Sequence, residues 1–307
     1  MATAFIGHAD CMRHDMGAYH PECPARLSAI DDQLISSGIA GYLQHHAAPL
    51  ATAEQLARVH PREYVEAIRA AAPQRGIAHL DPDTAMSPGT WDAALRAAGA
   101  AVLATDLVVG GEAENAFCSV RPPGHHATRT RAMGFCIFNN VAVAALHALE
   151  HHGLERVAII DFDVHHGNGT EDIFSDDERA LMVSTFQHPF YPYSGTDDPA
   201  PNMVNVPLPA GAGSQAFRDA VESRWVPALD DFEPQLVLFS AGFDAHVEDD
   251  MAMLRLVDQD YAWVTQQVKR VADRHAGGRI VSVLEGGYAL SALGRSVVQH
   301  LRVLGGF

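Results

Sequence analysis

Hydrophobic and polar positions follow two regular patterns along the chain. Short continuous apolar runs predict buried strands, and longer segments with apolar residues three or four positions apart predict amphipathic helices. The expected strands are residues 3–7, 116–120, 157–160, 181–186, 203–208, 236–240 and 280–284. The run of residues 157–160 is continuously apolar, as expected for a strand of a parallel sheet that is covered on both faces.

Helical patterns separate most of these strands. They cover residues 26–35, 55–72 with an interruption near Pro61, 91–109, 141–150 and 258–275, and a last helix follows residue 288. Strands that alternate with helices imply right-handed crossovers and a parallel sheet. We therefore predict one α/β domain, residues 1–307, with a central, mostly parallel β-sheet flanked by helices. For residues 80–90 we predict a loop. A second loop, residues 8–26, is expected to be too polar for the core.

Polar residues gather where four of the predicted strands end. The segments in question are 121–126, 161–166, 241–246 and 285–288. In open α/β sheets, functional sites lie beyond the carboxyl ends of the strands. We therefore expect these four segments to meet at one edge of the sheet.

The segment of residues 157–172 joins an apolar strand to residue types that bind metals. Asp161, Asp163 and His165 alternate, so their side chains point the same way while the backbone stays extended. A carboxylate and an imidazole two residues apart can then bind one ion. Gly167 and Gly169 end the strand.

Each polar group also has a plain structural explanation, as a surface pair, a helix cap, a core aromatic or a hydrogen-bonded turn. Their convergence favours function. Two acidic residues and one imidazole make a three-ligand site, and a catalytic zinc keeps its remaining coordination for water and substrate. Such a site suits hydrolysis. Ferrous iron also binds an Asp-His-Asp ligand set.

Composition and charge limit the classes of partner and the cellular compartment that we expect. The formal net charge of −17 and the lack of a clustered basic segment argue against direct nucleic-acid binding and fit a cationic substrate. The four cysteines show no Cys-x-x-Cys spacing, which favours a reducing cytoplasm. The first ten residues have no basic n-region, and no apolar run reaches the roughly 18 residues of a membrane span. No pattern indicates an oligomeric state.

Five ordered motifs carry a family resemblance. They are Arg-Pro-Pro-Gly-His-His at 121–126, Gly-Phe-Cys at 134–136, Asp-Phe-Asp-Val-His-His-Gly-Asn-Gly at 161–169, Ala-Gly-Phe-Asp at 241–244 and Glu-Gly-Gly-Tyr at 285–288. Together they resemble the histone deacetylase family, of the arginase and deacetylase fold. Asn168, where class I enzymes have aspartate, and the loop of residues 20–26 are similar to the class II branch.

The resemblance implies a role for each residue of the site. Zinc would be bound by Asp163, His165 and Asp244, while Asp161 would pair with His125, and Asn168 with His126. A carboxylate partner favours the imidazolium form of His125, whereas a neutral amide leaves the pKa of His126 near its usual value of about 6.5. His126 would then act as the general base, and Tyr288 would donate a hydrogen bond to the developing oxyanion.

The resemblance also implies a substrate channel and a potassium site. Phe135 and Tyr191 would line an acyl-lysine channel, and Asp83 would hold substrate backbone amides at its rim. Met251 occupies the position where polyamine-selective relatives carry glutamate, so that selectivity is not indicated. The aromatic loop of residues 188–193 either lines the channel or packs on its own domain. Structural potassium would lie near four residues, mostly bound through backbone oxygens: Asp161, Asp163, His165 and Ser184.

The expected function is that of a zinc-dependent amidohydrolase that removes acetyl or other acyl groups from lysine side chains of proteins or peptides, or from a related acylated amine. An acetylpolyamine deacetylase is the first alternative. A manganese ureohydrolase would need further carboxylates where the chain has Gly167 and His246. An inactive module that binds acyl ligands would not need His126 or Tyr288.

Overall fold

A central sheet of eight strands organises the protein. The computed structural model describes residues 2–307. Each pair of neighbouring strands in the sheet is parallel. The order is β2 (Gln44–Ala47), β1 (Thr3–Gly7), β5 (Asn115–Cys118), β10 (Ile280–Leu284), β9 (Leu236–Ala241), β6 (Val157–Asp161), β7 (Ala180–Gln187) and β8 (Met203–Leu208). The predicted α/β class with a parallel sheet is confirmed.

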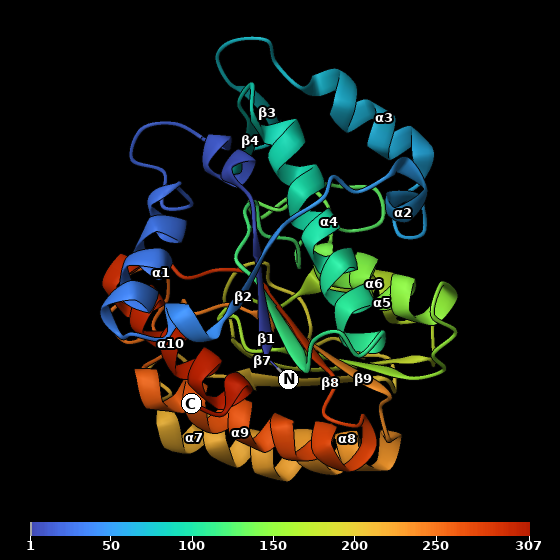
Figure 1. Cartoon of the computed structure of the whole chain (residues 1–307), viewed down its shortest axis with the longest axis vertical. Helices are drawn as coiled ribbons and strands as arrows, with labels where there is room; N and C mark the ends of the chain where they lie inside the picture. Colours follow the sequence, from blue (N-terminus) through green and yellow to red (C-terminus); the bar gives the residue numbers. More distant parts are fainter. Residues whose placement is uncertain (1) are drawn as a thin grey trace.

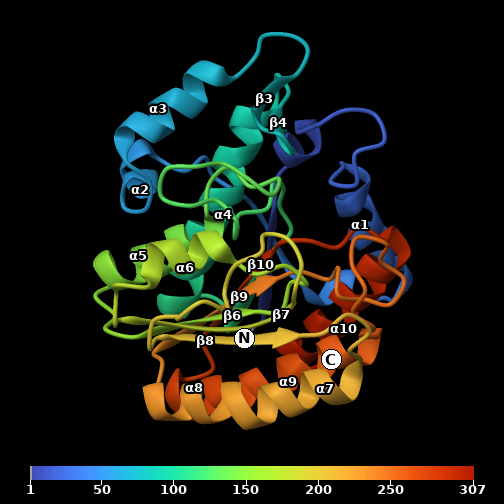
Figure 2. The ribbon, with the colours of Figure 1, turned by 180° about the vertical axis from the view of Figure 1, so that it is seen from behind.

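Helices cover both faces of this sheet (Figure 1). One face carries α4 (Thr90–Val109), α5 (Asn140–Glu150) and α6 (Asn168–Phe174). The other carries α7 (Ser214–Ala220), a short π-helix (Val221–Trp225), α8 (Val226–Phe232) and α9 (Asp258–His275). Next to α9 lies α10 (Leu290–Gly305), which packs in turn on α1 (Ala25–Ser36). Seen from behind, α2 (Ala53–Ala57) and α3 (Arg62–Ala71) extend beyond the sheet (Figure 2). Within residues 2–307, no helix is both long and apolar enough to cross a membrane.

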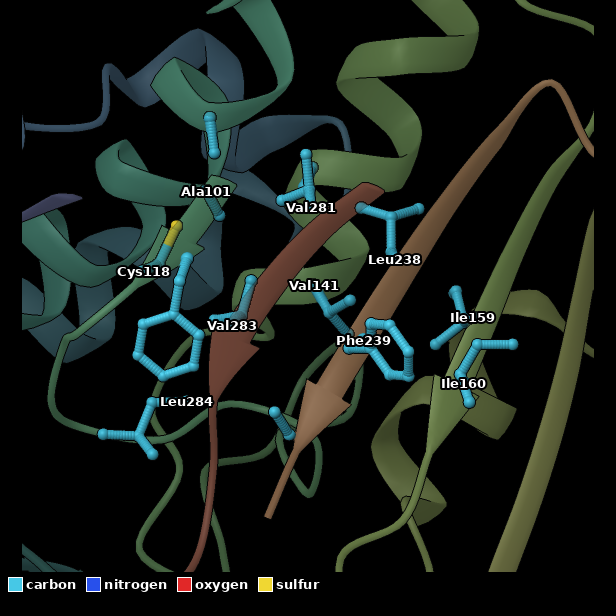
Figure 3. Close-up of a cluster of buried hydrophobic side chains, with 14 of the residues drawn as sticks. Ala101, Cys118, Val141, Ile159, Ile160, Leu238, Phe239, Val281, Val283 and Leu284 are labelled. Atoms are coloured by element: carbon cyan, nitrogen blue, oxygen red, sulfur yellow. The ribbon is translucent and has the colours of Figure 1, made fainter. Parts of the chain in front are cut away.

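The apolar runs of the strands build the core on both faces of the sheet. Ile159, Leu238 and Val281 lie in register across β6, β9 and β10 and are fully buried (Figure 3). Ile160 and Phe239, one position later, are paired in the same way and are equally buried. Burying one such side chain contributes roughly 1.5–3 kcal/mol. These rows fix the positions at which the strands end.

The segment of residues 80–90 differs from its prediction as a loop. It belongs to an antiparallel hairpin of β3 (Ala78–Asp81) and β4 (Thr84–Met86). Strands of three or four residues are too short to show a period, and Pro82 lies in the turn between them. The short elements β2, α6, α7 and α8 were not predicted either. The helix expected from residue 141 begins at Asn140 and is capped by Asn139, whose side chain accepts a hydrogen bond from the Ala142 amide (3.0 Å).

The prediction that the polar loop of residues 8–26 avoids the core is wrong. His14, Glu22 and Arg26 are completely buried. The Glu22 carboxylate lies 2.6 Å from Arg121 Nη2, 3.2 Å from Arg26 Nη1 and 3.2 Å from His14 Nε2. Burial alone would raise the pKa of Glu22, but Arg121, His14 and Arg26 hold it well below its usual range. A buried charge is tolerated when it is paired in this way, and the pairing ties the loop to the 121–126 turn.

Candidate active site

The four polar segments meet as predicted. They follow β5, β6, β9 and β10, which are consecutive strands in the sheet. Because these strands are parallel, their carboxyl ends share one edge. At that edge, one ligand atom from each of Asp163, His165 and Asp244 lies within 4.8 Å of the others, and all three residues are buried.

The candidate metal ligands form a compact group of two carboxylates and one imidazole. His165 Nδ1 lies 3.0 Å from Asp163 Oδ1 and 3.3 Å from Asp244 Oδ2. Asp244 Oδ1 accepts a hydrogen bond from the Val164 amide (2.9 Å), whereas Asp244 Oδ2 is buried without a hydrogen-bond partner. A buried carboxylate oxygen without a donor is suited to a cation.

The electrostatics of this group also fit a metal ion. Burial alone would lower the pKa of His165, but the hydrogen bond to Asp163 and the negative charges of Asp163 and Asp244 outweigh it and raise the pKa to about 10. Burial and the charge of Asp163 raise the pKa of Asp244 to about 6. Two carboxylates crowded together in the interior therefore need positive charge between them, and a divalent cation supplies it.

Two glycines leave the space that the carboxylates occupy. A Cβ atom added at Gly242 would overlap Asp163 Oδ2, and one added at Gly286 would overlap Asp244 Oδ2. The Gly286 amide also donates to Asp163 Oδ2 (2.9 Å). The glycines of the Ala-Gly-Phe-Asp and Glu-Gly-Gly-Tyr motifs are therefore required by close packing on the ligands.

The two adjacent histidines have different partners. His125 Nδ1 lies 2.9 Å from Asp161 Oδ2, and His126 Nδ1 lies 2.8 Å from Asn168 Oδ1. Burial alone would lower the pKa of His125, but Asp161 and Asp163 raise it well above 6.5. Burial, followed by the charges of His125 and His165, lowers the pKa of His126 well below 6.5.

The amide partner alone suggested that the pKa of His126 is near 6.5, but the pKa is well below this value. Its ring centroid lies 4.1 Å from that of His125 and 5.7 Å from that of His165, so positive charge on either ring disfavours a proton on His126. Asn168 Nδ2 donates to Met133 Sδ (3.4 Å), which leaves Asn168 Oδ1 as the acceptor for His126 Nδ1–H. Neutral His126 then has its basic lone pair on Nε2.

Tyr288 is held from two sides. Its ring lies edge-on to Phe135, with centroids 5.9 Å apart, and the Arg26 guanidinium lies 4.9 Å from its ring centroid. Its amide donates to Asp249 Oδ2 (2.6 Å), which also accepts from the Ala289 amide (2.9 Å). Burial raises the pKa of Tyr288 well above 10, so the hydroxyl keeps its proton and acts as a donor.

Aromatic side chains surround the histidines. The Tyr191 ring lies 5.3 Å from His126 and 6.1 Å from His165, and the Phe190 ring stacks on His165 at 5.6 Å. Phe135 has a left-handed backbone (φ 68°) and lies between Tyr288 and His20, whose ring centroid is 4.7 Å away. The loop of residues 188–193 therefore contacts the candidate site through Phe190 and Tyr191.

The remaining predicted positions lie around this centre. Asp83, at the tip of the β3–β4 hairpin, accepts from the Gly134 amide (3.0 Å) and so supports the Phe135 turn. Met251 lines a cavity of about 180 Å³ with Pro21, Tyr288 and the acidic residues 248–250. Ser184 is paired in register with Asp161, and its buried hydroxyl has no hydrogen-bond partner.

Several residues that support the site were not predicted. Glu285 Oε2 accepts hydrogen bonds from the Gly124 (2.6 Å) and His125 (3.1 Å) amides, and burial raises the pKa of Glu285 to about 7. Asp249 belongs to the acidic run of residues 248–250 and is buried. The signal for Glu285 was its place in the Glu-Gly-Gly-Tyr motif, whereas nothing distinguished Asp249 from its acidic neighbours.

The positions relevant to a binuclear manganese site carry no carboxylate. A Cβ atom at Gly167 would overlap Asp161 Oδ2, so this position has no room for a side chain. His246 Nε2 is paired with Asp258 Oδ1 at 3.1 Å. The site as built therefore has one set of ligands rather than two.

Comparisons with known proteins agree with this geometry. Residues 20–304 match the sequence model described as "Histone deacetylase domain". The chain is 40% identical over 294 residues to the "Histone deacetylase-like amidohydrolase" of Pseudomonas aeruginosa, covering 92% of this chain and 77% of that protein. It is 36% identical over 331 residues to the "Polyamine deacetylase HDAC10" of Mus musculus, covering 99% of this chain and 48% of that protein. The solved structure titled "Crystal Structure of HDA15 HD domain" superposes with a TM-score of 0.92 at 34% identity, covering 99% of this chain and 88% of that one.

Proposed function

The chain belongs to the histone deacetylase family of amide-bond hydrolases, and on this premise we propose that it is a zinc-dependent deacylase. Its substrates would be acyl-lysine side chains of proteins or peptides, or related acylated amines. The observation that carries the proposal is the meeting of three elements at one sheet edge: the Asp163, His165 and Asp244 group, the histidine pair and Tyr288. Residues 1–307 would act as one catalytic domain.

Asp163, His165 and Asp244 would hold the metal. Zinc supplies Lewis acidity toward the amide carbonyl and lowers the pKa of water to about 7. Ferrous iron fits the same donor set. The unpartnered Oδ2 atom of Asp244 supports this assignment.

The histidine pair would move the proton. Neutral His126 accepts a proton at Nε2 from the attacking water and later donates it to the leaving amine. His125, kept as imidazolium by Asp161, supplies fixed positive charge beside the reacting atoms. Tyr288 would donate its hydroxyl proton in a hydrogen bond to the oxyanion that develops on the carbonyl oxygen.

The aromatic side chains of Phe135 and Tyr191 would enclose the aliphatic part of the substrate, while Asp83 and Met251 would lie nearer the rim. The Asp83 oxygen that accepts from Gly134 also accepts from the Thr84 hydroxyl (2.9 Å). Asp83 therefore supports the channel wall in addition to any contact with substrate amides.

An acetylpolyamine is the second candidate substrate. The cavity beside Tyr288 is lined by Glu248, Asp249 and Asp250, which would attract a second ammonium group. Glu248 is already paired with Arg295 (2.7 Å), so Asp250 would make the stronger contribution. A relative named as a polyamine deacetylase supports keeping this candidate.

Structural potassium would lie near Asp161, Asp163, His165 and Ser184. The unpartnered Ser184 hydroxyl, adjacent to Asp161 in the sheet, supports an oxygen-rich cation site there.

All four cysteines are free thiols, which supports a reducing compartment such as the cytoplasm.

A substrate panel tests the proposal. The zinc-loaded protein is assayed on acetyl-lysine peptides, longer acyl-lysine peptides and acetylated polyamines, with Asp244→Asn as the control. We expect turnover of at least one class by the wild type and none by the control. Ligand binding without turnover of any class would favour an inactive acyl-binding module instead.

A further inference from the structure

A second group of histidine and carboxylate side chains lies away from the active site. In the described part of the chain, Asp106 on α4 and three histidines at the end of α5 place one ligand atom each within 4.8 Å of one another. The histidines are His147, His151 and His152. Helices α4 and α5 pack side by side on one face of the sheet (Figures 1 and 2). This group has no part in the proposed deacylation.

The end of helix α5 arranges the histidines. His147 and His151 are four residues apart, so they share one face of the helix, and their rings stack with centroids 4.7 Å apart. The chain then leaves the helix and places the His152 ring 5.2 Å from His147 and 5.0 Å from His151. Asp106 Oδ1 lies 2.7 Å from Nε2 of both His147 and His152.

We propose that Asp106, His147, His151 and His152 form a second metal site. Three imidazoles and one carboxylate match the donors and the coordination number of zinc, and imidazole favours zinc, copper or nickel over magnesium or calcium. His147 is buried, whereas His151 is exposed, so an ion can enter from solvent. A bound ion would join α4 to α5 and stabilise the folded protein.

Arg58 competes with this ion. Its Nη1 atom lies 2.8 Å from His147 Nδ1, and because a guanidinium only donates, Nδ1 accepts and Nε2 carries the proton that is donated to Asp106. Binding a metal at His147 Nε2 displaces that proton and requires one on Nδ1, which breaks the Arg58 contact. Arg58 then has Glu150 as its remaining partner, with Nε and Oε2 already 3.7 Å apart.

Metal counting on the tag-free holoenzyme tests the site. Protein that holds one zinc in the active site is titrated with zinc or cobalt(II), and bound metal is measured after dialysis. We expect a second equivalent in the wild type and in the control His79→Ala, which removes an exposed histidine outside the group. The double variant His151→Ala/His152→Ala should bind one equivalent and keep the deacylation rate of the wild type. One equivalent in the wild type, or two in the double variant, would overturn the proposal.

The variant Arg58→Gln should have the opposite effect and strengthen metal binding at the second site. Removing the guanidinium frees His147 Nδ1 and takes away a positive charge, so the second equivalent should bind with a lower dissociation constant. Its thermal unfolding midpoint should rise on adding metal, and this rise should vanish when His151→Ala and His152→Ala are added. An unchanged or weaker affinity would contradict the geometry, because Arg58 would then not oppose the ion. The deciding readouts are metal counts, metal affinities and stabilities, so the test of the second site stands whether or not the proposed deacylation is correct.

Discussion

His126 Nδ1 lies 2.8 Å from Asn168 Oδ1, so the residue proposed as the general base has a neutral amide as its partner. Its neighbour His125 has a carboxylate partner, Asp161, at 2.9 Å. The two adjacent imidazoles differ in charge state, because Asp161 and Asp163 raise the pKa of His125, whereas burial and the charges of His125 and His165 lower that of His126. Separation of this kind assigns one group to fixed charge and the other to proton transfer.

Asn168→Asp should change the pH dependence of the reaction. A carboxylate at this distance raises the pKa of an imidazole by about one to three units. A base works only when deprotonated, so the acidic limb of kcat/KM should move to higher pH by that amount. Steady-state rates on an acyl-lysine peptide across pH measure this shift. A limb that stays in place would show that His126 does not set it.

Tyr288→Phe should leave the fold and the metal content intact and lower the deacylation rate by about 10² to 10³, as expected for the loss of one oxyanion donor. Zinc per chain and circular dichroism serve as controls. Near-normal turnover would remove Tyr288 from the mechanism.

Asp249→Asn should act through Tyr288. Asp249 Oδ2 accepts from the Tyr288 and Ala289 amides, and Asp249 Oδ1 accepts from the Met251 amide (3.0 Å). Asparagine is uncharged and has one acceptor oxygen, so it cannot keep all three of these hydrogen bonds at full strength. The Tyr288 backbone is then held less firmly, and we expect kcat to fall about 10-fold, equivalent to about 1.4 kcal/mol. In a Tyr288→Phe background the same change should cost far less. Additive losses would mean that Asp249 supports the fold alone.

Gly286→Ala should reduce the metal content. The added methyl group would overlap Asp244 Oδ2 and approach Asp163 Oδ2, so the ligands must shift. Gly41→Ala is the matched control, because a Cβ atom there meets nothing within 4 Å. Zinc per chain by elemental analysis should fall for Gly286→Ala and stay at the wild-type level for Gly41→Ala. Equal zinc in both variants would contradict the close packing.

The sequence predicted the central strands and the place where the candidate ligands meet for one physical reason. Buried parallel strands require continuous apolar runs, and residues such as Asp163 and Asp244 stand where those runs end. Interactions between residues far apart in the chain leave no comparable pattern in the sequence. Glu22 and Arg121 are 99 positions apart, and only the fold shows that they form a buried ion pair. The depressed pKa of His126 likewise depends on the spatial positions of His125 and His165.

Metal removal and restoration test the central claim most directly. The rate of acyl-lysine hydrolysis is measured for wild-type protein and Asp244→Asn, first stripped of metal and then after addition of zinc. The account predicts that stripped wild type is inactive, that zinc restores its activity, and that Asp244→Asn stays inactive in both states. Full hydrolysis by stripped wild-type protein, or restoration of Asp244→Asn by zinc to the wild-type rate, would contradict it.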